Sequence, residues 1–279
     1  MHDRHKRVVL VTGASSGLGN ACATQLAKKG FLVYGTSRNP DEKNRRADEF
    51  YELIRMEAED DDSVNMAISY VLAKEERIDI LLYCAGSGIA GAVEETPIVE
   101  AQRQLDVNFL GVARAVKALL PGMRANGGTI LVVGSMAGIV GVPFQAYYAA
   151  SKFALEGFVD SLRMELRPYP VQVSLIELGD FRTGFTEART VFGLGEGSPY
   201  ATAGQRSIAG MEESEKDGSD PVVLARLVLK IINKKRLKAR YDVGPRMQRF
   251  AMRLLAFLPR RIAELLLMAY YKVSPRNGV

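Results

Sequence analysis

Short, mainly apolar runs recur along the chain, separated by stretches with helical periodicity. Six of them have strand length and cover residues 8–12, 31–36, 53–56, 78–83, 129–133 and 171–176. Such runs are typical of parallel strands buried on both faces. Residues 237–243 are a plausible seventh strand. The pattern predicts an α/β fold with a doubly wound parallel sheet of about seven strands, which binds ligands at the carboxyl ends of the strands.

One predicted helix contains a residue that does not suit it. The helix pattern begins near Pro97 and reaches about Asn126, and Asn108 lies inside it among apolar neighbours. Asn is unfavourable in the middle of a helix, and a buried Asn needs hydrogen-bond partners. We therefore expect a kinked helix with a bound water, rather than a polar residue on a helix surface.

Two segments depart from the alternation. Residues 184–219 are rich in Gly, Ser and charge and have weak periodicity, and we interpret them as a mobile lid over the site, with a disordered insertion as the alternative. Residues 246–258 and 260–272 are basic and amphipathic, and Pro259 separates them. We therefore divide the chain into a main domain at 1–245 and a C-terminal basic amphipathic helical extension at 246–279.

Composition narrows the classes of function. With 47% hydrophobic and 25% charged residues, the 279-residue chain can bury a full core. Both histidines, His2 and His5, lie in the N-terminal tail, which argues against a His-based triad and predicts no metal site. Cys22 and Cys84 lie in apolar runs and suggest buried thiols in a reducing compartment. No signal peptide or membrane-spanning run is evident, so we expect a cytoplasmic protein.

A glycine-rich segment follows the first predicted strand and precedes a helix pattern over residues 20–29. It reads Thr12-Gly13-Ala14-Ser15-Ser16-Gly17-Leu18-Gly19. In this setting Gly13 makes the tight turn, Gly17 lets the backbone approach a pyrophosphate, and Gly19 lets helix and strand pack closely. The helix N-terminus then faces the anion. The segment predicts a dinucleotide site, the alternative being an ordinary glycine-rich turn.

The end of the second predicted strand indicates which dinucleotide binds. NAD-binding proteins usually carry an acid there, whereas this chain has Ser37-Arg38-Asn39, and a cation suits the 2′-phosphate of NADP. We expect NADP in preference to NAD, although Arg38 as an ordinary surface residue is the alternative. Glu57 and Ala58 follow the third strand, where an adenine edge would lie, and small residues 84–88 follow the fourth.

The fifth predicted strand leads into the candidate chemistry. Ser135 follows that strand, and Tyr148 and Lys152 lie four residues apart on one face of the next helix. An ammonium beside a phenol lowers its pKa, so the three side chains suggest acid–base chemistry on an alcohol or a carbonyl. The pair alone is weak evidence, because Tyr70 and Lys74 have the same spacing.

Together these motifs resemble the short-chain dehydrogenase/reductase family over about residues 6–245. The TGxxxGxG spacing matches the compact branch, and the family's catalytic tetrad is matched in order by Asn108, Ser135, Tyr148 and Lys152. The resemblance implies a Rossmann-type fold and an NAD(P)-dependent oxidoreductase acting on CH–OH groups. Cys84 stands where the family has an Asn that stabilises the central sheet, which puts the local packing in question.

The resemblance also implies roles. Tyr148 would be the general acid/base, Lys152 would lower its pKa and bind the nicotinamide ribose, and Ser135 would polarise the carbonyl. Asn108 would fix a water that passes protons to Lys152. The expected cofactor-binding residues are Gly13, Ser15, Ser16, Gly17, Leu18, Gly19, Ser37, Arg38, Glu57, Ala58, Cys84, Ala85, Gly86, Tyr148, Lys152, Gly179, Phe181 and Thr183. The expected substrate-facing residues are Met136, Gly141, Val142, Gln145 and Phe185.

The C-terminal part carries most of the basic character. Residues 221–279 contain 14 Lys and Arg against two acids, whereas residues 1–220 contain 23 against 30. The segment is similar to the hydroxysteroid and retinol dehydrogenase-like branch and favours a lipophilic substrate: a steroid, retinoid, long-chain or sphingoid ketone. Its amphipathic pattern fits peripheral membrane contact, packing against the protein's own cleft, or packing against a second subunit.

Several alternatives remain at this point. The resemblance implies a homodimer or homotetramer through the helices carrying Asn108 and Tyr148, and NADP implies reduction as the direction. A nucleotide-sensing regulator without turnover would be expected to lack the Tyr–Lys pair, and a 3-oxoacyl-type reductase would keep it. A nucleic-acid binder would need aromatic interleaving that the tail lacks. A nucleotide-sugar epimerase does not fit the glycine spacing.

Overall fold

The computed structural model of the protein describes residues 6–40 and 50–273. His2 and His5 lie outside the described residues. The main sheet has seven parallel strands in the order β3-β2-β1-β4-β6-β7-β9. These are β1 (Val8–Thr12), β2 (Leu32–Ser37), β3 (Glu52–Arg55), β4 (Ile80–Tyr83), β6 (Gly128–Val133), β7 (Val171–Leu178) and β9 (Arg240–Val243). The predicted doubly wound sheet of about seven strands is confirmed.

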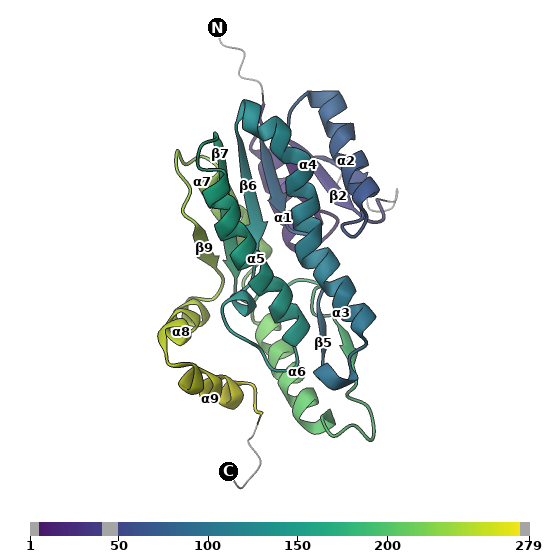
Figure 1. Cartoon of the computed structure of the whole chain (residues 1–279), viewed down its shortest axis with the longest axis vertical. Coiled ribbons are helices and arrows are strands. Elements are labelled where there is room, and N and C mark those ends of the chain that lie inside the picture. Colours follow the sequence, from purple (N-terminus) through teal and green to yellow (C-terminus); the bar gives the residue numbers. More distant parts are fainter. Residues whose placement is uncertain (1–5, 41–49, 274–279) are drawn as a thin grey trace.

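Helices cover both faces of this sheet (Figure 1). The covering helices are α1 (Gly17–Lys28), α2 (Asp61–Glu75), α4 (Gly111–Asn126), α5 (Ala146–Glu165) and α7 (Pro221–Ile231), whereas α3 (Ile98–Leu105) lies beyond the lower end of the sheet. Alternate residues of β1 point to opposite faces: Leu10 joins the core under α2, α4 and α5, whereas Val9 and Val11 join the core under α1 and α7. Burial of both faces explains why the central strands β1 and β4 are mainly apolar.

The ends of the elements match local signals. The carboxylate of Asp60 accepts a hydrogen bond from the backbone of Ser63 and caps α2, which is the capping role that the acidic run suggests. The helix α5 ends at Glu165, before two prolines at positions 168 and 170. The first helix begins earlier than its apolar pattern predicts, at Gly17 instead of residue 20, so two glycines lie inside its first turn.

The long helix predicted between Pro97 and Asn126 is interrupted. A π-helical turn, η3 (Asp106–Leu110), separates α3 from α4 and carries Asn108. Such a turn widens the helix locally and turns a side chain away from regular register, and π-turns are common at functional sites. The expected irregularity at Asn108 is therefore present as a π-turn.

Residues 184–219 are more regular than their sequence suggests. They contain β8 (Thr190–Phe192), which pairs in parallel with β5 (Ile89–Gly91), and the 16-residue helix α6 (Ala201–Lys216). The disordered-insertion alternative is therefore contradicted. Local periodicity misses these elements because α6 packs through small residues, among them Gly204 and Ser207, and so lacks a strong apolar stripe. In Figure 1 they lie below the carboxyl ends of the strands.

The chain ends in two further helices, α8 (Arg246–Phe257) and α9 (Arg260–Tyr270). They are drawn in yellow at the lower left of Figure 1. Pro259 occupies the N-cap position of α9 and separates the two helices, as its position in the sequence predicts. Their inner faces pack on η4 (Met136–Gly138), the short 3-10 turn after β6. The extension therefore lies beside the carboxyl ends of the sheet.

Candidate active site

A cavity of about 760 Å³ lies at the carboxyl ends of β1, β4 and β6. These strands meet where the chain order reverses, next to β1, which is the point at which open α/β sheets bind ligands. Among its lining residues are the glycine turn, the loop after β4, the start of α5 and the segment after β7. Segments far apart in the sequence thus share one cavity.

The glycine turn has the backbone geometry that its glycines permit. Gly13 and Gly17 have φ angles of 65° and 54°, in the left-handed region that favours glycine. A Cβ at Gly19 would lie 2.2 Å from the carbonyl oxygen of Gly13, so any side chain there would push α1 away from the turn. Close packing of helix and strand therefore requires Gly19, as the sequence predicts.

The N-terminus of α1 fits an anionic group. The side chain of Ser16 does not cap the helix, and the first turn carries no acid, so its amide groups face the cavity without a competing carboxylate. Thr183 stands opposite, because a Cβ at Gly17 would lie 3.4 Å from its Cβ. These residues form a cradle of the size and polarity that a dinucleotide phosphate needs.

The cavity is lined by every predicted cofactor residue except Glu57. Ser37, Arg38 and Ala58 line it, but Glu57 does not. The Glu57 carboxylate pairs with Arg55 at 2.6 Å and so points away from the cavity. Glu59 lines the cavity instead, two positions further on, because the chain has already turned toward α2.

The loop after β4 shows how Cys84 is accommodated. The buried hydroxyl of Thr12 accepts hydrogen bonds from the backbone amides of Cys84 at 3.0 Å and Ala85 at 2.9 Å. The Cys84 thiol interacts with that of Cys22, and this contact together with burial raises the pKa of Cys22. Cys22 is buried as predicted, whereas Cys84 is half-buried because it borders the cavity.

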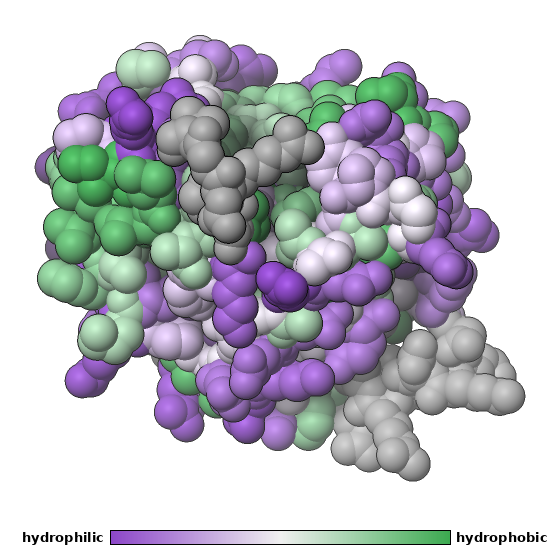
Figure 2. All heavy atoms as spheres, turned by 90° about the horizontal axis from the view of Figure 1, so that it is seen from below, coloured by the Kyte–Doolittle hydropathy of each residue, from purple (hydrophilic) through white to green (hydrophobic). Residues whose placement is uncertain are grey.

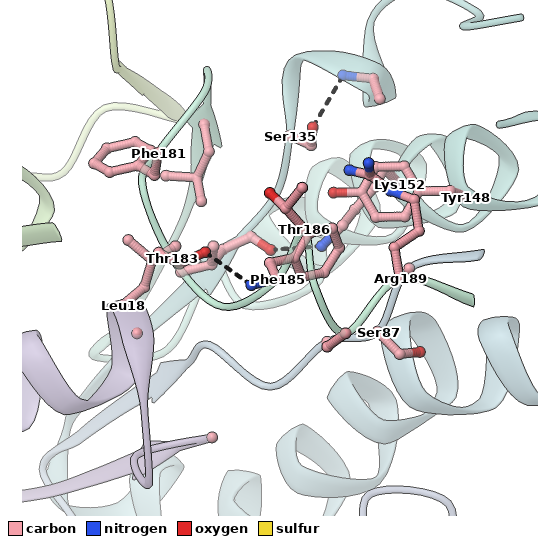
Figure 3. Close-up of a pocket in the computed structure, with 18 of the residues that line it drawn as sticks. Leu18, Ser87, Ser135, Tyr148, Lys152, Phe181, Thr183, Phe185, Thr186 and Arg189 are labelled. Atoms are coloured by element: carbon pink, nitrogen blue, oxygen red, sulfur yellow. Dashed lines mark hydrogen bonds between the residues drawn. The ribbon is translucent and has the colours of Figure 1, made fainter. Parts of the chain in front are cut away.

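Ser135, Tyr148 and Lys152 meet at the centre of the cavity (Figure 3). Lys152 is buried, donates to the carbonyl of Val133 at 3.2 Å, and has its Nζ 5.7 Å from the centroid of the Tyr148 ring. The Ser135 hydroxyl accepts a hydrogen bond from the amide of Ala137 at 3.1 Å, which fixes its position. The three predicted side chains are therefore brought together.

Burial governs the protonation of this group. Burial raises the pKa of Tyr148 to about 12, although the hydrogen bond with Ser135 and the charge of Arg189 lower it. Burial also lowers the pKa of Lys152 to about 8. The net pKa of Tyr148 is therefore raised, since desolvation disfavours the charged form of both groups, and a lowering of that pKa by Lys152 stays a prediction. Tyr148 is protonated at neutral pH.

Asn108 does not line the cavity and is almost fully buried behind it. Its Nδ2 donates to the Ser151 hydroxyl and to the carbonyl of Ser87, each at 3.0 Å, and its Oδ1 accepts from the amide of Ser87 at 2.9 Å. These protein groups use both N–H donors of its side-chain amide and one hydrogen bond to its oxygen, and the bound water stays a prediction. The sequence could not identify them, because Ser151 and Ser87 approach only through the fold.

The segment after β7 closes one side of the cavity. Gly179, Phe181, Thr183 and Phe185 line it, as predicted, and the Phe185 ring lies 5.9 Å from that of Tyr148. Met211 of α6 packs in the same apolar cluster as Val142 and Tyr148. Residues 184–219 therefore cover the active-site side chains, and their mobility stays a prediction.

A buried ion pair in this cover is not foreseen from the sequence. The Arg189 side chain is 1% exposed, pairs with Glu215, and has no partner among the described residues for its Nε and Nη1 atoms. Thr186 donates to the other oxygen of Glu215 at 2.6 Å. Both charged residues line the cavity, and Figure 3 shows Arg189 beside Tyr148. No sequence signal identifies Arg189, because its partner lies 26 positions away.

Of the remaining predicted substrate residues, all but one line the cavity. Met136, Val142 and Gln145 line the cavity, whereas Gly141 is exposed, and a Cβ added to it would meet no atom within 4 Å. The chain turns outward at Gly141, so only its neighbours face inward. Met252 and Tyr271 also line the cavity, in agreement with the alternative that the C-terminal segment packs against the protein's own cleft.

The second Tyr–Lys pair lies elsewhere. Tyr70 and Lys74 are on the exposed face of α2, and both bind Glu52 of β3, Lys74 at 3.0 Å. Neither lines the cavity. Within residues 6–40 and 50–273, no three acidic, His or Cys side chains gather in a way that could hold a metal ion. No helix in that part of the chain is long and apolar enough to cross a membrane.

Comparison with known proteins agrees with this geometry. Residues 7–191 match the family model of the short chain dehydrogenases. The chain is 36% identical over 269 residues to 3-ketodihydrosphingosine reductase of Bacteroides thetaiotaomicron, covering 96% of this chain and 98% of the relative. It is 38% identical over 195 residues to human 17-beta-hydroxysteroid dehydrogenase type 1, covering 65% of this chain and 59% of the relative.

A solved structure gives the same result for the fold. A metagenomic short-chain oxidoreductase in complex with NADP superposes with a TM-score of 0.68 at 26% identity, covering 85% of this chain and 96% of the other. The family resemblance inferred from the motifs, including its similarity to hydroxysteroid dehydrogenases, is confirmed.

Proposed function

The chain belongs to the short-chain dehydrogenase family and is an oxidoreductase acting on CH–OH groups, and from this we propose that it uses NADP(H) to reduce the ketone of a long-chain lipophilic substrate. One observation carries the proposal: Ser135, Tyr148 and Lys152 converge on a cavity that continues to the glycine turn. The NADP complex of the metagenomic relative and the position of Arg38 support the choice of cofactor.

Each of the active-site residues would have a separate role in the reduction. The glycine turn and Arg38 would hold the cofactor, which when bound supplies the hydride. Tyr148, with its pKa raised to about 12, holds the proton that the substrate oxygen needs. Ser135 would donate a hydrogen bond to that oxygen, and the charge of Lys152 would stabilise the phenolate left after proton transfer. Asn108 would act by positioning the helix α5.

The shape of the cavity supports an amphipathic substrate. Apolar side chains line one part of it, namely Met136, Val140, Val142, Met211 and Met252. The Arg189–Glu215 pair supplies an acid for an ammonium group and guanidinium N–H groups for an oxygen. A long-chain 2-amino ketone, the class to which a sphingoid ketone belongs, matches both parts. The alignment with the Bacteroides reductase covers the lid and the C-terminal helices as well.

We also propose a homodimer or homotetramer formed through the helices that carry Asn108 and Tyr148. Leu110 and Phe153 on those helices are 40% and 44% exposed, which gives that face apolar surface to bury.

The protein would work in the cytoplasm or at its membranes.

A substrate panel tests the activity. Purified protein is given NADPH or NADH with a long-chain 2-amino ketone, the same ketone without the amine, a steroid ketone and a 3-oxoacyl thioester, and loss of reduced nicotinamide absorbance is followed. We expect the amino ketone with NADPH to give the highest kcat/KM. Fastest turnover of the thioester would favour a 3-oxoacyl-type reductase. NADPH binding without any turnover would favour a nucleotide-sensing regulator.

A further inference from the structure

The inner faces of α8 and α9 are firmly attached to the body of the protein. Met252 and Leu267 are buried in a cluster with Met136 and Val140. The Gln248 side chain accepts a hydrogen bond from the backbone of Asp180 at 2.8 Å, in the loop after β7. These contacts satisfy one of the three explanations for the amphipathic pattern, since part of each helix packs against the protein's own cleft.

The outer faces of the same helices are apolar and uncovered. Four residues of α8 at helical spacing are exposed: Met247 by 78%, Phe250 by 65%, Leu254 by 51% and Phe257 by 88%. Four residues of α9 continue the surface: Ile262 by 47%, Leu265 by 57%, Leu266 by 50% and Tyr270 by 59%. We call these eight residues the docking face. Figure 2 shows hydrophobic side chains gathered on the left, the side on which α8 and α9 lie in Figure 1.

The size and position of the docking face call for a partner. Soluble proteins rarely expose a contiguous apolar surface of this kind unless it binds something. Phe257, the most exposed of the eight, lies at the end of α8 beside the turn to α9, so it projects where the two helices meet. The two helices are apolar on their inner, packed face and also on their outer face. Packing against the protein's own cleft explains the inner face but not the outer one.

The charges around the docking face indicate which kind of partner fits it. Residues 246–273 contain six Lys and Arg and a single acid, Glu264. Arg249 and Arg253 pair with Asp242, and Arg260 pairs with Glu264. Arg246, Arg261 and Lys272 are also exposed. A second copy meeting this face about a two-fold axis would bring two strongly positive surfaces together. Apolar side chains rimmed by arginines instead match the acyl boundary and the anionic headgroups of a membrane surface.

The docking face adjoins the mouth of the active-site cavity. Gln248, Met252, Tyr270 and Tyr271 line that cavity and come from the same C-terminal segment. We propose that the docking face binds the surface of a membrane containing anionic lipid and holds the cavity mouth against it. On the activity proposed above, a long-chain ketone would then pass from the lipid to Tyr148 without crossing water.

Vesicle binding tests the proposal without substrate. The whole protein is sedimented with vesicles of phosphatidylcholine, alone or with about a third phosphatidylglycerol. We expect binding to the anionic vesicles that weakens with added salt. Phe250→Ser with Phe257→Ser should reduce the affinity at least about tenfold, because it removes two aromatic side chains from the apolar contact with the acyl chains. Arg260→Glu with Arg261→Glu should also weaken vesicle binding. The difference in affinity from the wild type should be larger at low salt than at high salt, because salt screens the attraction to anionic lipid.

Matched controls separate docking from folding. Met66→Ser removes a side chain that is 66% exposed on α2, and Lys230→Glu reverses an exposed charge on α7; both should bind vesicles like the wild type. Thermal unfolding and NADPH binding should be unchanged in every variant. Wild-type protein that ignores anionic vesicles, or a double Phe variant that binds them equally well, would overturn the proposal. A fall in oligomeric mass of the double Phe variant in lipid-free solution would assign the face to a subunit contact instead.

Activity distinguishes this proposal from that of the reaction. The double Phe variant should keep its kcat/KM on a short, water-soluble ketone and lose it on a long-chain ketone held in vesicles. Vesicle binding without any ketone reduction would refute the proposed reaction and leave the docking face in place.

Discussion

The side-chain amide of Asn108 donates a hydrogen bond to the hydroxyl of Ser151 at 3.0 Å, across 43 positions of sequence. Ser151 in turn donates to the backbone carbonyl of Tyr148 at 2.7 Å. The π-turn η3 is thereby tied to the helix α5, on the turn that carries Tyr148 and Lys152. We propose that Asn108 is a positioning residue, which would hold Tyr148 and Lys152 in place without itself lining the cavity.

Replacing Asn108 should impair rate more than cofactor binding. Asn108→Ala leaves the Ser87 groups and the Ser151 hydroxyl without this partner, so we expect a loss of about 1–3 kcal/mol of stability. We also expect kcat to fall at least about tenfold, because α5 is no longer held in register. The KM for NADPH should change little. Ser151→Ala removes one bond and should have a smaller effect; a normal kcat in folded Asn108→Ala would refute the positioning role.

Tyr148→Phe should abolish proton donation and leave the cavity intact. The ring and its contact with Phe185 remain, so NADPH should bind within a few-fold of wild type. Loss of the acid should reduce kcat by about 10²–10⁴. Tyr70→Phe is a matched control, since Tyr70 precedes a lysine at the same spacing but lies on the surface. Retained activity in Tyr148→Phe would remove this residue from the mechanism.

The pH dependence of reduction should follow Lys152. Its pKa is lowered to about 8, so its charge is present at pH 7 and is lost as the pH rises through 8. Because that charge would stabilise the phenolate of Tyr148, kcat/KM for reduction should decline above about pH 8. In Lys152→Arg the decline should move to higher pH, as a guanidinium stays charged. A decline at the same pH in that variant would assign it to another group.

Glu177 should make the protein less stable in alkaline solution. Burial, with Glu156 and Asp242 nearby, raises its pKa from 4.5 to about 7, although Arg240 lowers it. A raised folded pKa gives stability that is complete below pH 4.5 and is lost as the pH rises through 7. Glu177→Gln should therefore be more stable than wild type by about 1–3 kcal/mol at pH 8.5 and gain little at pH 5. Denaturant unfolding at both pH values measures this, with exposed Glu187→Gln expected to match wild type.

Arg38→Asp should shift cofactor preference toward NAD. A charge-assisted contact with the 2′-phosphate contributes about 1.5–3 kcal/mol, so the ratio of kcat/KM values for NADPH and NADH should fall about tenfold to a hundredfold. Lys29→Asp, which reverses an exposed charge at the end of α1, should leave the ratio unchanged. An unchanged ratio in Arg38→Asp would exclude the role of Arg38 in binding the phosphate.

Features that depend on neighbouring residues could be predicted from the amino-acid sequence. Strand length and burial on both faces follow from apolar runs, and the turn after β1 follows from Gly13, Gly17 and Gly19, which allow a backbone geometry and a close approach that other residues rarely permit. The spacing of Tyr148 and Lys152 places them on one face of any helix. The family and most of the expected lining residues of the cavity could therefore be predicted.

Features that depend on residues far apart in the sequence became visible in the folded protein. The partners of Asn108, and the Arg189–Glu215 pair that covers Tyr148, join positions tens of residues apart. The pKa values of Tyr148 and Lys152 depend on how deeply both side chains are buried. Their spacing in the sequence carries no information about that burial. In the same way, the amphipathic pattern of the last two helices could not show that Met252 faces inward while Phe257 is left exposed. That division arises because one face of each helix meets the body of the protein.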